Sequence, residues 1–169
     1  MKNKTQKLVM AALLASLCCV ATMIVKIPSP MKGYINLGDC VVLLSGWLLS
    51  PFYGFLAAGL GSALADLFSG YTVYAPATFM IKGVMALVSF YGFKLLSKSF
   101  SRPVSIIFSG LAAEVLMILG YFVFEGFLYG FAPSAVNIPA NALQGAAGLI
   151  LGAILIKVFR KNNIFSSDK

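Results

Sequence analysis

Five ionisable side chains interrupt the long apolar stretches of this chain, and any chemistry would depend on them. They are Asp39, Asp66, Lys82, Glu114 and Glu125. An ionisable group near the centre of a bilayer costs about 2.5 to 3.5 kcal/mol on insertion scales, so each one needs a partner or a function. Glu114 falls near the middle of its apolar stretch and has no evident partner. A carboxylate in that position more often marks a substrate or ion path than a scaffold contact.

Helical spacing groups further polar side chains into two stripes, each with residues three or four positions apart. The stripes are Glu114, Met117, Tyr121 and Glu125, and Asn137, Asn141 and Gln144. Residues at this spacing share one face of a helix. If the two helices are neighbours, a pocket of carboxylate, phenol and carboxamide groups opens between them, and such a pocket suits a small polar ring. Hydrogen bonds between helices are the alternative explanation of Asn141 and Gln144.

Structural explanations exist for other polar residues as well. Asp66 and Lys82 would tie two helices together if they formed an ion pair. Asn36 and Asp39 precede an apolar run, where Asn and Asp side chains cap the free N–H groups of a helix. These explanations stand beside a role in binding.

The sequence excludes several classes of site. It contains no histidine, so a histidine metal site, a histidine proton relay and a Ser-His-Asp triad are ruled out. Cys18, Cys19 and Cys40 lie in apolar runs, and two of them are adjacent, which is unlike a disulfide framework or a metal site. The Walker A pattern G-x-x-x-x-G-K-[ST] is missing, so this chain does not hydrolyse ATP itself. We therefore expect no enzyme activity, no cofactor and no metal.

Composition places the chain in a membrane. Of its 169 residues, 60% are hydrophobic and only 11% are charged, whereas about a quarter of a soluble domain is charged. Several apolar runs approach the roughly 20 residues of a spanning helix, and none alternates like a barrel strand. We predict a single domain over residues 1–169, an all-α bundle with six transmembrane helices. The predicted helices are Thr5–Val25, Leu37–Leu49, Phe52–Phe68, Pro76–Leu96, Val104–Phe124 and Asn137–Phe159.

The loops and the cations predict the orientation. Lys26–Tyr34 contains two prolines and a glycine, cannot continue a helix and could act as a flap over a site. Six helices place both termini on one side, together with ten of the 13 Lys and Arg residues. Because Lys and Arg accumulate in cytoplasmic loops, both termini are predicted to be cytoplasmic. The loops Lys26–Tyr34, Ser69–Ala75 and Glu125–Val136 then face outward. The net charge of +8 is explained by topology, and we expect no nucleic-acid partner.

Nearly the whole chain resembles the substrate-binding S components of energy-coupling factor (ECF) vitamin transporters. The most specific stretches are Tyr34–Asp39 (YINLGD), Ser62–Asp66 (SALAD) and Gly70–Gly83 (GYTVYAPATFMIKG), and they are similar to the subgroup assigned to hydroxymethylpyrimidine or pyridoxine uptake. Ala11 and Ala15 match the small-residue motif on the first helix of this family, which implies packing against a partner helix. Packing within the chain is the alternative for these two alanines.

The resemblance implies a multi-pass protein of the bacterial cytoplasmic membrane that captures a small water-soluble vitamin or precursor from outside. It implies docking on an ECF transmembrane scaffold subunit with two cytoplasmic ATPase subunits, followed by toppling of the loaded protein in the lipid. In the family, a lid after the first helix and the last three helices hold the ligand. With the polar stripes, this gives the candidate substrate-binding residues Tyr34, Asn36, Asp39, Lys82, Glu114, Tyr121, Asn137, Asn141 and Gln144.

Other functions remain open at this point. Carboxylates beside carboxamides and tyrosines fit an uncharged or cationic heteroaromatic ring with hydroxymethyl groups, which favours hydroxymethylpyrimidine or pyridoxine over riboflavin or another vitamin. A self-sufficient proton-coupled secondary carrier is the alternative from another class, because Asp39, Asp66 and Glu114 could carry protons. An inverted repeat, which such carriers often contain, is not detectable.

Overall fold

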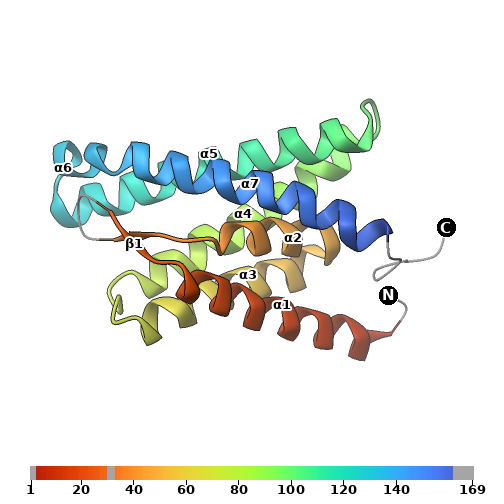
Figure 1. The fold of residues 1–169 in the computed structure, drawn as a ribbon, viewed down its shortest axis with the longest axis horizontal. Helices are drawn as coiled ribbons and strands as arrows, with labels where there is room; N and C mark the ends of the chain where they lie inside the picture. The colour runs from red at the N-terminus through yellow and green to blue at the C-terminus, as the bar shows by residue number, and fades with distance from the viewer. Residues whose placement is uncertain (1–2, 30–32, 162–169) are drawn as a thin grey trace.

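The computed structural model describes residues 3–29 and 33–161. This part of the chain contains helices and one small two-stranded hairpin (Figure 1). The elements in chain order are α1 (Lys4–Ile24), β1 (Ile27–Pro28), β2 (Tyr34–Ile35), α2 (Asp39–Leu48), α3 (Pro51–Phe68), α4 (Ala75–Leu96), α5 (Arg102–Tyr129), α6 (Phe131–Val136) and α7 (Ile138–Lys161). The predicted all-α membrane architecture is therefore confirmed for the described residues.

Within the described residues, five helices are long and apolar enough to cross a membrane: α1, α3, α4, α5 and α7. The second predicted crossing, Leu37–Leu49, contains only the ten-residue helix α2. At 1.5 Å per residue this helix is about 15 Å long, roughly half the hydrocarbon thickness. The predicted count of six spans is therefore not confirmed in the described residues, where the second predicted crossing is the short helix Asp39–Leu48.

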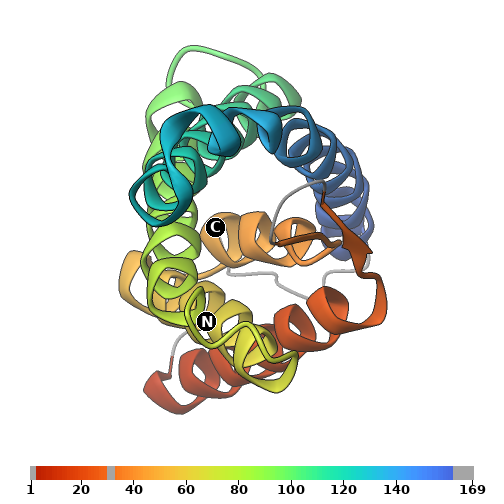
Figure 2. The same ribbon diagram turned by 90° about the vertical axis from the view of Figure 1, so that its left-hand side faces the viewer.

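Helix α2 occupies the centre of the bundle. Figure 2, a view along the helices, shows it surrounded by α1, α3, α4, α5 and α7. Its apolar run is almost completely buried, with Leu43 and Leu44 at 0% exposure. Trp47 near its end donates a hydrogen bond from Nε1 to Ser109 Oγ of α5 at 3.1 Å. A helix that is apolar on every side must be covered by lipid or by protein, and α2 is too short to cross the bilayer, which is consistent with its place among the other helices.

Small residues bring α1 and α3 into close contact. A Cβ atom at Gly61 of α3 would collide with the backbone carbonyl oxygen of Ala15, so only glycine allows this approach. Ala11 is also buried, at 7% exposure. Ala11 and Ala15 therefore face the inside of this chain, whereas Ala12 and Ser16 lie on the exposed face of α1.

The chain between α5 and α7 is more regular than the predicted loop Glu125–Val136. Helix α5 continues to Tyr129, and the short helix α6 follows after Gly130, whose φ of +93° lies in the region that favours glycine. Ser134 of α6 donates its hydroxyl to the carbonyl oxygen of Phe122 at 2.7 Å. This bond folds α6 back on α5, and Glu125 becomes a helical residue.

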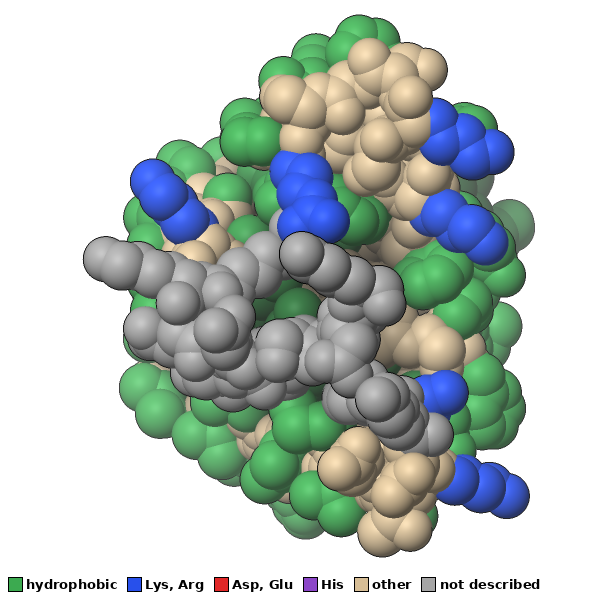
Figure 3. Space-filling model, turned by 90° about the vertical axis from the view of Figure 1, so that its right-hand side faces the viewer, with side chains coloured by type: hydrophobic (Ala, Val, Ile, Leu, Met, Phe, Trp, Pro, Cys, Tyr) green, Lys and Arg blue, Asp and Glu red, His purple; other side chains and the backbone are tan. Residues whose placement is uncertain are grey.

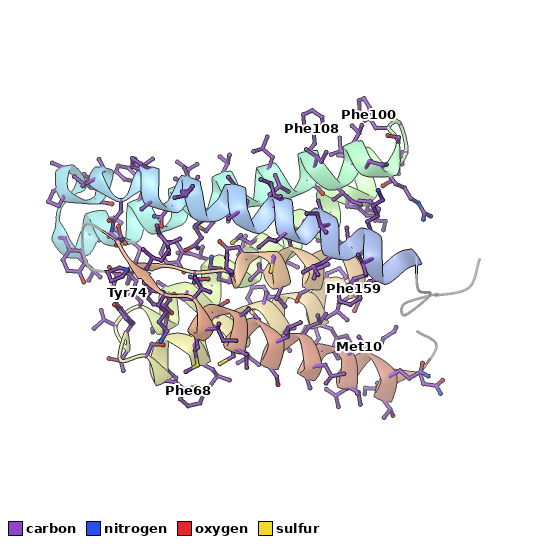
Figure 4. The ribbon with its side chains drawn as sticks, in the orientation of Figure 1. Met10, Phe68, Tyr74, Phe100, Phe108 and Phe159 are labelled. Atoms are coloured by element: carbon purple, nitrogen blue, oxygen red, sulfur yellow. The ribbon has the colours of Figure 1, made fainter. Side chains whose placement is uncertain are left out.

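The two ends of the molecule differ in charge. The first residues of α1 and the last of α7 lie at one end, which we call the terminal end, and the β1–β2 hairpin lies at the opposite, polar end (Figure 1). A view onto the terminal end shows Lys and Arg side chains and, among the described residues, no Asp or Glu (Figure 3). Lys2, Lys32 and Lys169, which were counted for the orientation, lie outside the described residues. Phe68, Phe100 and Phe108 point away from the bundle (Figure 4), as expected of lipid-facing side chains.

Candidate functional site

The lid hairpin, formed by β1 and β2, is fastened over the polar end of the bundle. Lys26 donates a hydrogen bond from Nζ to Ser69 Oγ at 2.5 Å, just after α3. The Tyr34 hydroxyl donates to Asp66 Oδ1 at 2.6 Å, and the Tyr34 ring lies 4.8 Å from the ring of Tyr71. Burial, and then the hydrogen bond with Asp66, raise the pKa of the Tyr34 phenol well above its usual range. Tyr34 therefore remains a hydrogen-bond donor.

A buried polar network lies beneath the lid and joins three helices. Gln144 of α7 accepts hydrogen bonds at Oε1 from the backbone N–H of Asn36 at 2.9 Å and from Asn36 Nδ2 at 3.2 Å. It donates from Nε2 to Asp39 Oδ2 at 2.7 Å. Asp39 also forms an ion pair with Lys82 of α4, and both side chains are at most 3% exposed. The polar side-chain atoms of this network therefore have hydrogen-bond or ion-pair partners, as is usual for buried polar groups.

A second group of polar contacts joins the start of α4, helix α5 and the residue before α7. Asn137 donates from Nδ2 to Glu125 Oε2 at 2.9 Å, and the Tyr74 hydroxyl donates to Glu125 Oε1 at 3.4 Å. The hydroxyl groups of Thr78 and Tyr121 are 3.0 Å apart and share a hydrogen bond. Figure 4 shows Tyr74 among the elements of the polar end. These contacts order the side walls of the space below the lid.

A cavity lies between the lid and the buried network. It offers about 40 Å³ to water-sized spheres, and since one water needs about 10–15 Å³ by this measure, it has room for about three waters. Its walls come from the lid, α3, the start of α4, α5 and α7. The lining residues are Ser29, Gly33, Tyr34, Asn36, Asp66, Tyr71, Tyr74, Thr78, Tyr121, Glu125, Asn141 and Gln144.

Two polar groups of this lining can form further hydrogen bonds, which makes them available to a ligand. Asp66 Oδ2 is buried and accepts no hydrogen bond from the described residues, although Oδ1 of the same carboxylate is bound by Tyr34. Asn141 lines the cavity, and no described residue hydrogen-bonds its carboxamide. Aromatic rings together with such acceptors and donors can hold a flat polar ring by stacking and hydrogen bonds. In the described part of the chain, no group of three Cys, Asp or Glu side chains is placed to hold a metal ion.

Glu114 lies behind the cavity wall. Its side chain is 3% exposed, and neither carboxylate oxygen has a hydrogen-bond partner among the described residues. Glycines of α7 leave room for the Glu114 side chain. At Gly148, a Cβ atom would lie 3.1 Å from Glu114 Oε1 and 2.6 Å from the Cβ of Asp39. A Cβ at Gly145 would likewise lie 2.9 Å from Oε2. Glu114 thus adjoins the buried network on its side away from the lid.

The structure divides the nine predicted binding residues into two groups. Those that line the cavity are Tyr34, Asn36, Tyr121, Asn141 and Gln144. Those that lie behind the lining are Asp39, Lys82, Glu114 and Asn137.

Two structural explanations from the sequence are wrong. Lys82 pairs with Asp39 and not with Asp66, because α2 lies against α4 and brings Asp39 to Lys82, while the lid tyrosine covers Asp66. Asp39 does not cap α2, since its carboxylate bonds to Lys82 and Gln144. Asn36 does bind a backbone N–H at this helix start, that of Gly38 at 2.9 Å.

Sequence reasoning missed several lining residues. Tyr71, Tyr74 and Thr78 lie at the turn before α4 and in its first turn, where spacings of three and four residues place them on one side. This spacing was readable within Gly70–Gly83, but tyrosine and threonine carry no charge that draws attention in an apolar segment. Ser29 and Gly33 reach the cavity only through the fold of the lid hairpin.

Comparison with known proteins adds a family and a fold. A family model described as "ECF-type riboflavin transporter, S component" matches residues 2–161. A protein of Pyrococcus woesei, described as an uncharacterized protein in a gap 3′ region, is 33% identical over 143 residues, which cover 84% of this chain and 93% of the relative.

Two solved structures are similar to the whole chain. One is the S component of a bacterial ECF transporter, with a TM-score of 0.69 and 20% identity over 98% of this chain and 100% of that one. The other is an S component for biotin from an ECF-type ABC transporter, with a TM-score of 0.69 and 20% identity over 95% of each chain. At this identity the two structures support the fold alone.

Proposed function

The chain belongs to the family of ECF-type riboflavin transporter S components, and from this premise we propose that it captures a small water-soluble vitamin at the polar end of the bundle. The observation that carries the proposal is the cavity under the lid hairpin. It is lined by tyrosine rings and by two polar groups, Asp66 Oδ2 and the Asn141 carboxamide, to which no described residue hydrogen-bonds. As a multi-pass membrane protein of this family, it is a substrate-binding component of a transporter and not an enzyme.

The size and polarity of the cavity favour a single heteroaromatic ring. The cavity has room for about three waters, which is less than any of these vitamins occupies, so binding requires the lid to open; a six-membered ring with short substituents needs less widening than the three fused rings of riboflavin. Asp66 Oδ2 and Asn141 offer partners for amino or hydroxymethyl groups, and Tyr34 and Tyr71 offer ring faces. Hydroxymethylpyrimidine and pyridoxine both carry such groups. We propose one of these two as the substrate.

The predicted binding residues take two roles in this proposal. Tyr34, Asn36, Tyr121, Asn141 and Gln144 contact the substrate from the cavity wall. Behind the wall, the Asp39–Lys82 ion pair holds Gln144 in position, and Gln144 in turn holds Asn36. A wall fixed in this way loses little side-chain entropy on binding, which favours high affinity.

Transport itself requires partners. The proposal places the polar end outside the cell membrane and the basic terminal end in the cytoplasm, consistent with the positive-inside rule. An ECF scaffold subunit and two ATPase subunits would receive the loaded protein, which topples to present the cavity to the cytoplasm. The exposed face of α1 is the proposed scaffold contact, and it includes Ala12 and Ser16 rather than the buried Ala11.

Riboflavin remains the second candidate substrate, because the matching family model carries that description. Mass spectrometry of small molecules released from protein purified in mild detergent separates the candidates directly. Recovery of hydroxymethylpyrimidine or pyridoxine supports the proposal, and recovery of riboflavin overturns the choice of substrate while leaving the family intact.

A self-sufficient proton-coupled carrier is tested in cells that lack every ECF scaffold and ATPase subunit. We expect no uptake of the recovered vitamin in those cells and uptake when the partners are restored. Uptake without the partners would replace the proposed mechanism with that of a carrier.

A further inference from the structure

A groove of about 310 Å³ runs between the start of α5 and the end of α7, far from the cavity under the lid. Its lining is apolar along the floor, where Ile106 is 8% exposed and Ile156 only 1%. Two cations, Arg102 and Lys157, stand at its rim and are exposed. The complete lining is Arg102, Pro103, Ile106, Ile107, Ala153, Ile156 and Lys157.

The two cations have no acidic partner among the described residues. The described carboxylates, Asp39, Asp66, Glu114 and Glu125, are all buried elsewhere in the bundle. Basic and not acidic side chains are visible on the terminal end where the groove begins (Figure 3). Among the described residues, the rim therefore carries positive charge without an acidic counterpart beside an apolar floor.

The surroundings of the groove face lipid. Phe108 on α5 is 56% exposed, and Ile154 and Val158 on α7 are 54% and 47% exposed. These apolar side chains would be unfavourable in water and are expected beside acyl chains. A ligand of this groove must accordingly be compatible with the membrane and carry a negative charge at the level of the helix ends.

We propose that the groove binds one anionic phospholipid, with its phosphate between Arg102 and Lys157 and an acyl chain along Ile106, Ile107 and Ala153. Basic pockets between transmembrane helices are suited to anionic head groups. A soluble anion would leave the apolar floor unused, and a zwitterionic lipid would leave the positive charge uncompensated. An acidic segment of a protein partner fits less well, because the flanking helix faces are apolar and lipid-facing.

Native mass spectrometry tests the site on the full chain in mild detergent, titrated with phosphatidylglycerol or phosphatidylcholine. We expect one phosphatidylglycerol to remain bound and phosphatidylcholine to dissociate. The variant Arg102→Gln/Lys157→Gln should weaken phosphatidylglycerol retention by about tenfold or more. The matched control is Lys94→Gln/Lys98→Gln, which removes the same charge from exposed positions at the same end but outside the groove, and it should retain the lipid.

A second variant, Ala153→Leu, fills the groove without changing its charge and should also release phosphatidylglycerol. Its thermal unfolding reports whether the bundle is intact, and a folded Ala153→Leu protein that keeps the lipid would overturn the use of the groove floor. Equal retention of the two lipids, or an equal loss in the Lys94/Lys98 control, would show a diffuse charge effect and overturn the proposal. None of these outcomes depends on vitamin binding.

Discussion

Among single residues, Tyr34 connects the lid to the rest of the site. Its hydroxyl reaches Asp66 of α3 and its ring packs on Tyr71, so the same side chain holds the lid to the bundle and forms part of the cavity wall. Its pKa is raised above the ordinary value of 10.0 by burial and by the nearby Asp66 carboxylate. The folded protein therefore keeps this proton at a pH at which the unfolded chain releases it.

This difference predicts a pH dependence of stability. Below about pH 10 both states hold the proton and Tyr34 adds no slope; above it the unfolded state binds fewer protons, so stability falls as pH rises. The variant Tyr34→Phe lacks this titration, and its melting temperature should fall less steeply between pH 9 and 11, a range set about the usual tyrosine pKa. Thermal unfolding of both proteins in detergent measures the two slopes, and parallel slopes would show that Tyr34 is not buried against Asp66.

At the residue scale the sequence predicted part of the cavity lining. Spacing on the fifth and last helices placed Tyr121, Asn141 and Gln144 toward one space, and the structure brings them there. Spacing along a helix does not reveal which distant helix supplies a partner, and for this reason Lys82 was first paired with Asp66. The partner, Asp39, depends on the central position of α2, which no local pattern encodes.

At the scale of elements, the Asp39–Lys82 pair holds α2 against α4 inside the bundle. Asp39→Asn would leave the Lys82 ammonium buried without its counter-charge and should cost about 3 to 5 kcal/mol of stability. The double variant Asp39→Asn/Lys82→Met removes the orphaned charge and should recover most of that loss. Thermal unfolding in detergent measures both. A double variant no more stable than Asp39→Asn would mean that the charge pair is not the source of the effect.

The exposed face of α1 carries the proposed scaffold contact. Ala12→Leu/Ser16→Leu should prevent a close approach by a partner helix and reduce recovery of the scaffold subunit in co-purification, without changing vitamin affinity. Ala11→Leu is the comparison, because Ala11 is buried within the chain and the added atoms should cost about 1 to 3 kcal/mol of stability. Normal scaffold recovery by the Ala12/Ser16 variant would exclude this face from docking.

The elements themselves were only partly predictable. Long apolar runs located the five long helices, and the predicted start of the third helix at Phe52 lies one residue after the observed start of α3 at Pro51. The length of α2 was overestimated, because an apolar run does not show whether it crosses lipid or is enclosed by other helices. The continuation of α5 past Phe124 depends on α6 folding back over Gly126, where a Cβ atom would collide with the Phe131 ring.

At the scale of the whole molecule, the charge difference between the two ends predicts the orientation in the membrane. Thr72→Cys lies in the exposed turn before α4 and Ser97→Cys at the opposite end of that helix, exposed beside Lys98. A membrane-impermeant maleimide applied to intact cells should label Cys at position 72 and label position 97 only after the cells are opened. Cys18, Cys19 and Cys40 are present in both variants, so the unmodified chain is the background control. The reverse labelling pattern would place the polar end in the cytoplasm and contradict the proposed orientation.

The central claim is that the cavity under the lid binds a single-ring vitamin, and calorimetric titration of the purified protein tests it most directly. Hydroxymethylpyrimidine, pyridoxine and riboflavin would be titrated into the wild type, Asn141→Ala and the exposed-surface control Leu143→Ala, whose side chain is 65% exposed in the wild type. We predict tight binding of one single-ring vitamin, a loss of about 1 to 3 kcal/mol in Asn141→Ala from the unpaired polar group, and wild-type affinity in Leu143→Ala. The account of this site would be contradicted if none of the three vitamins bound tightly, or if wild type and Asn141→Ala bound the vitamin with equal affinity.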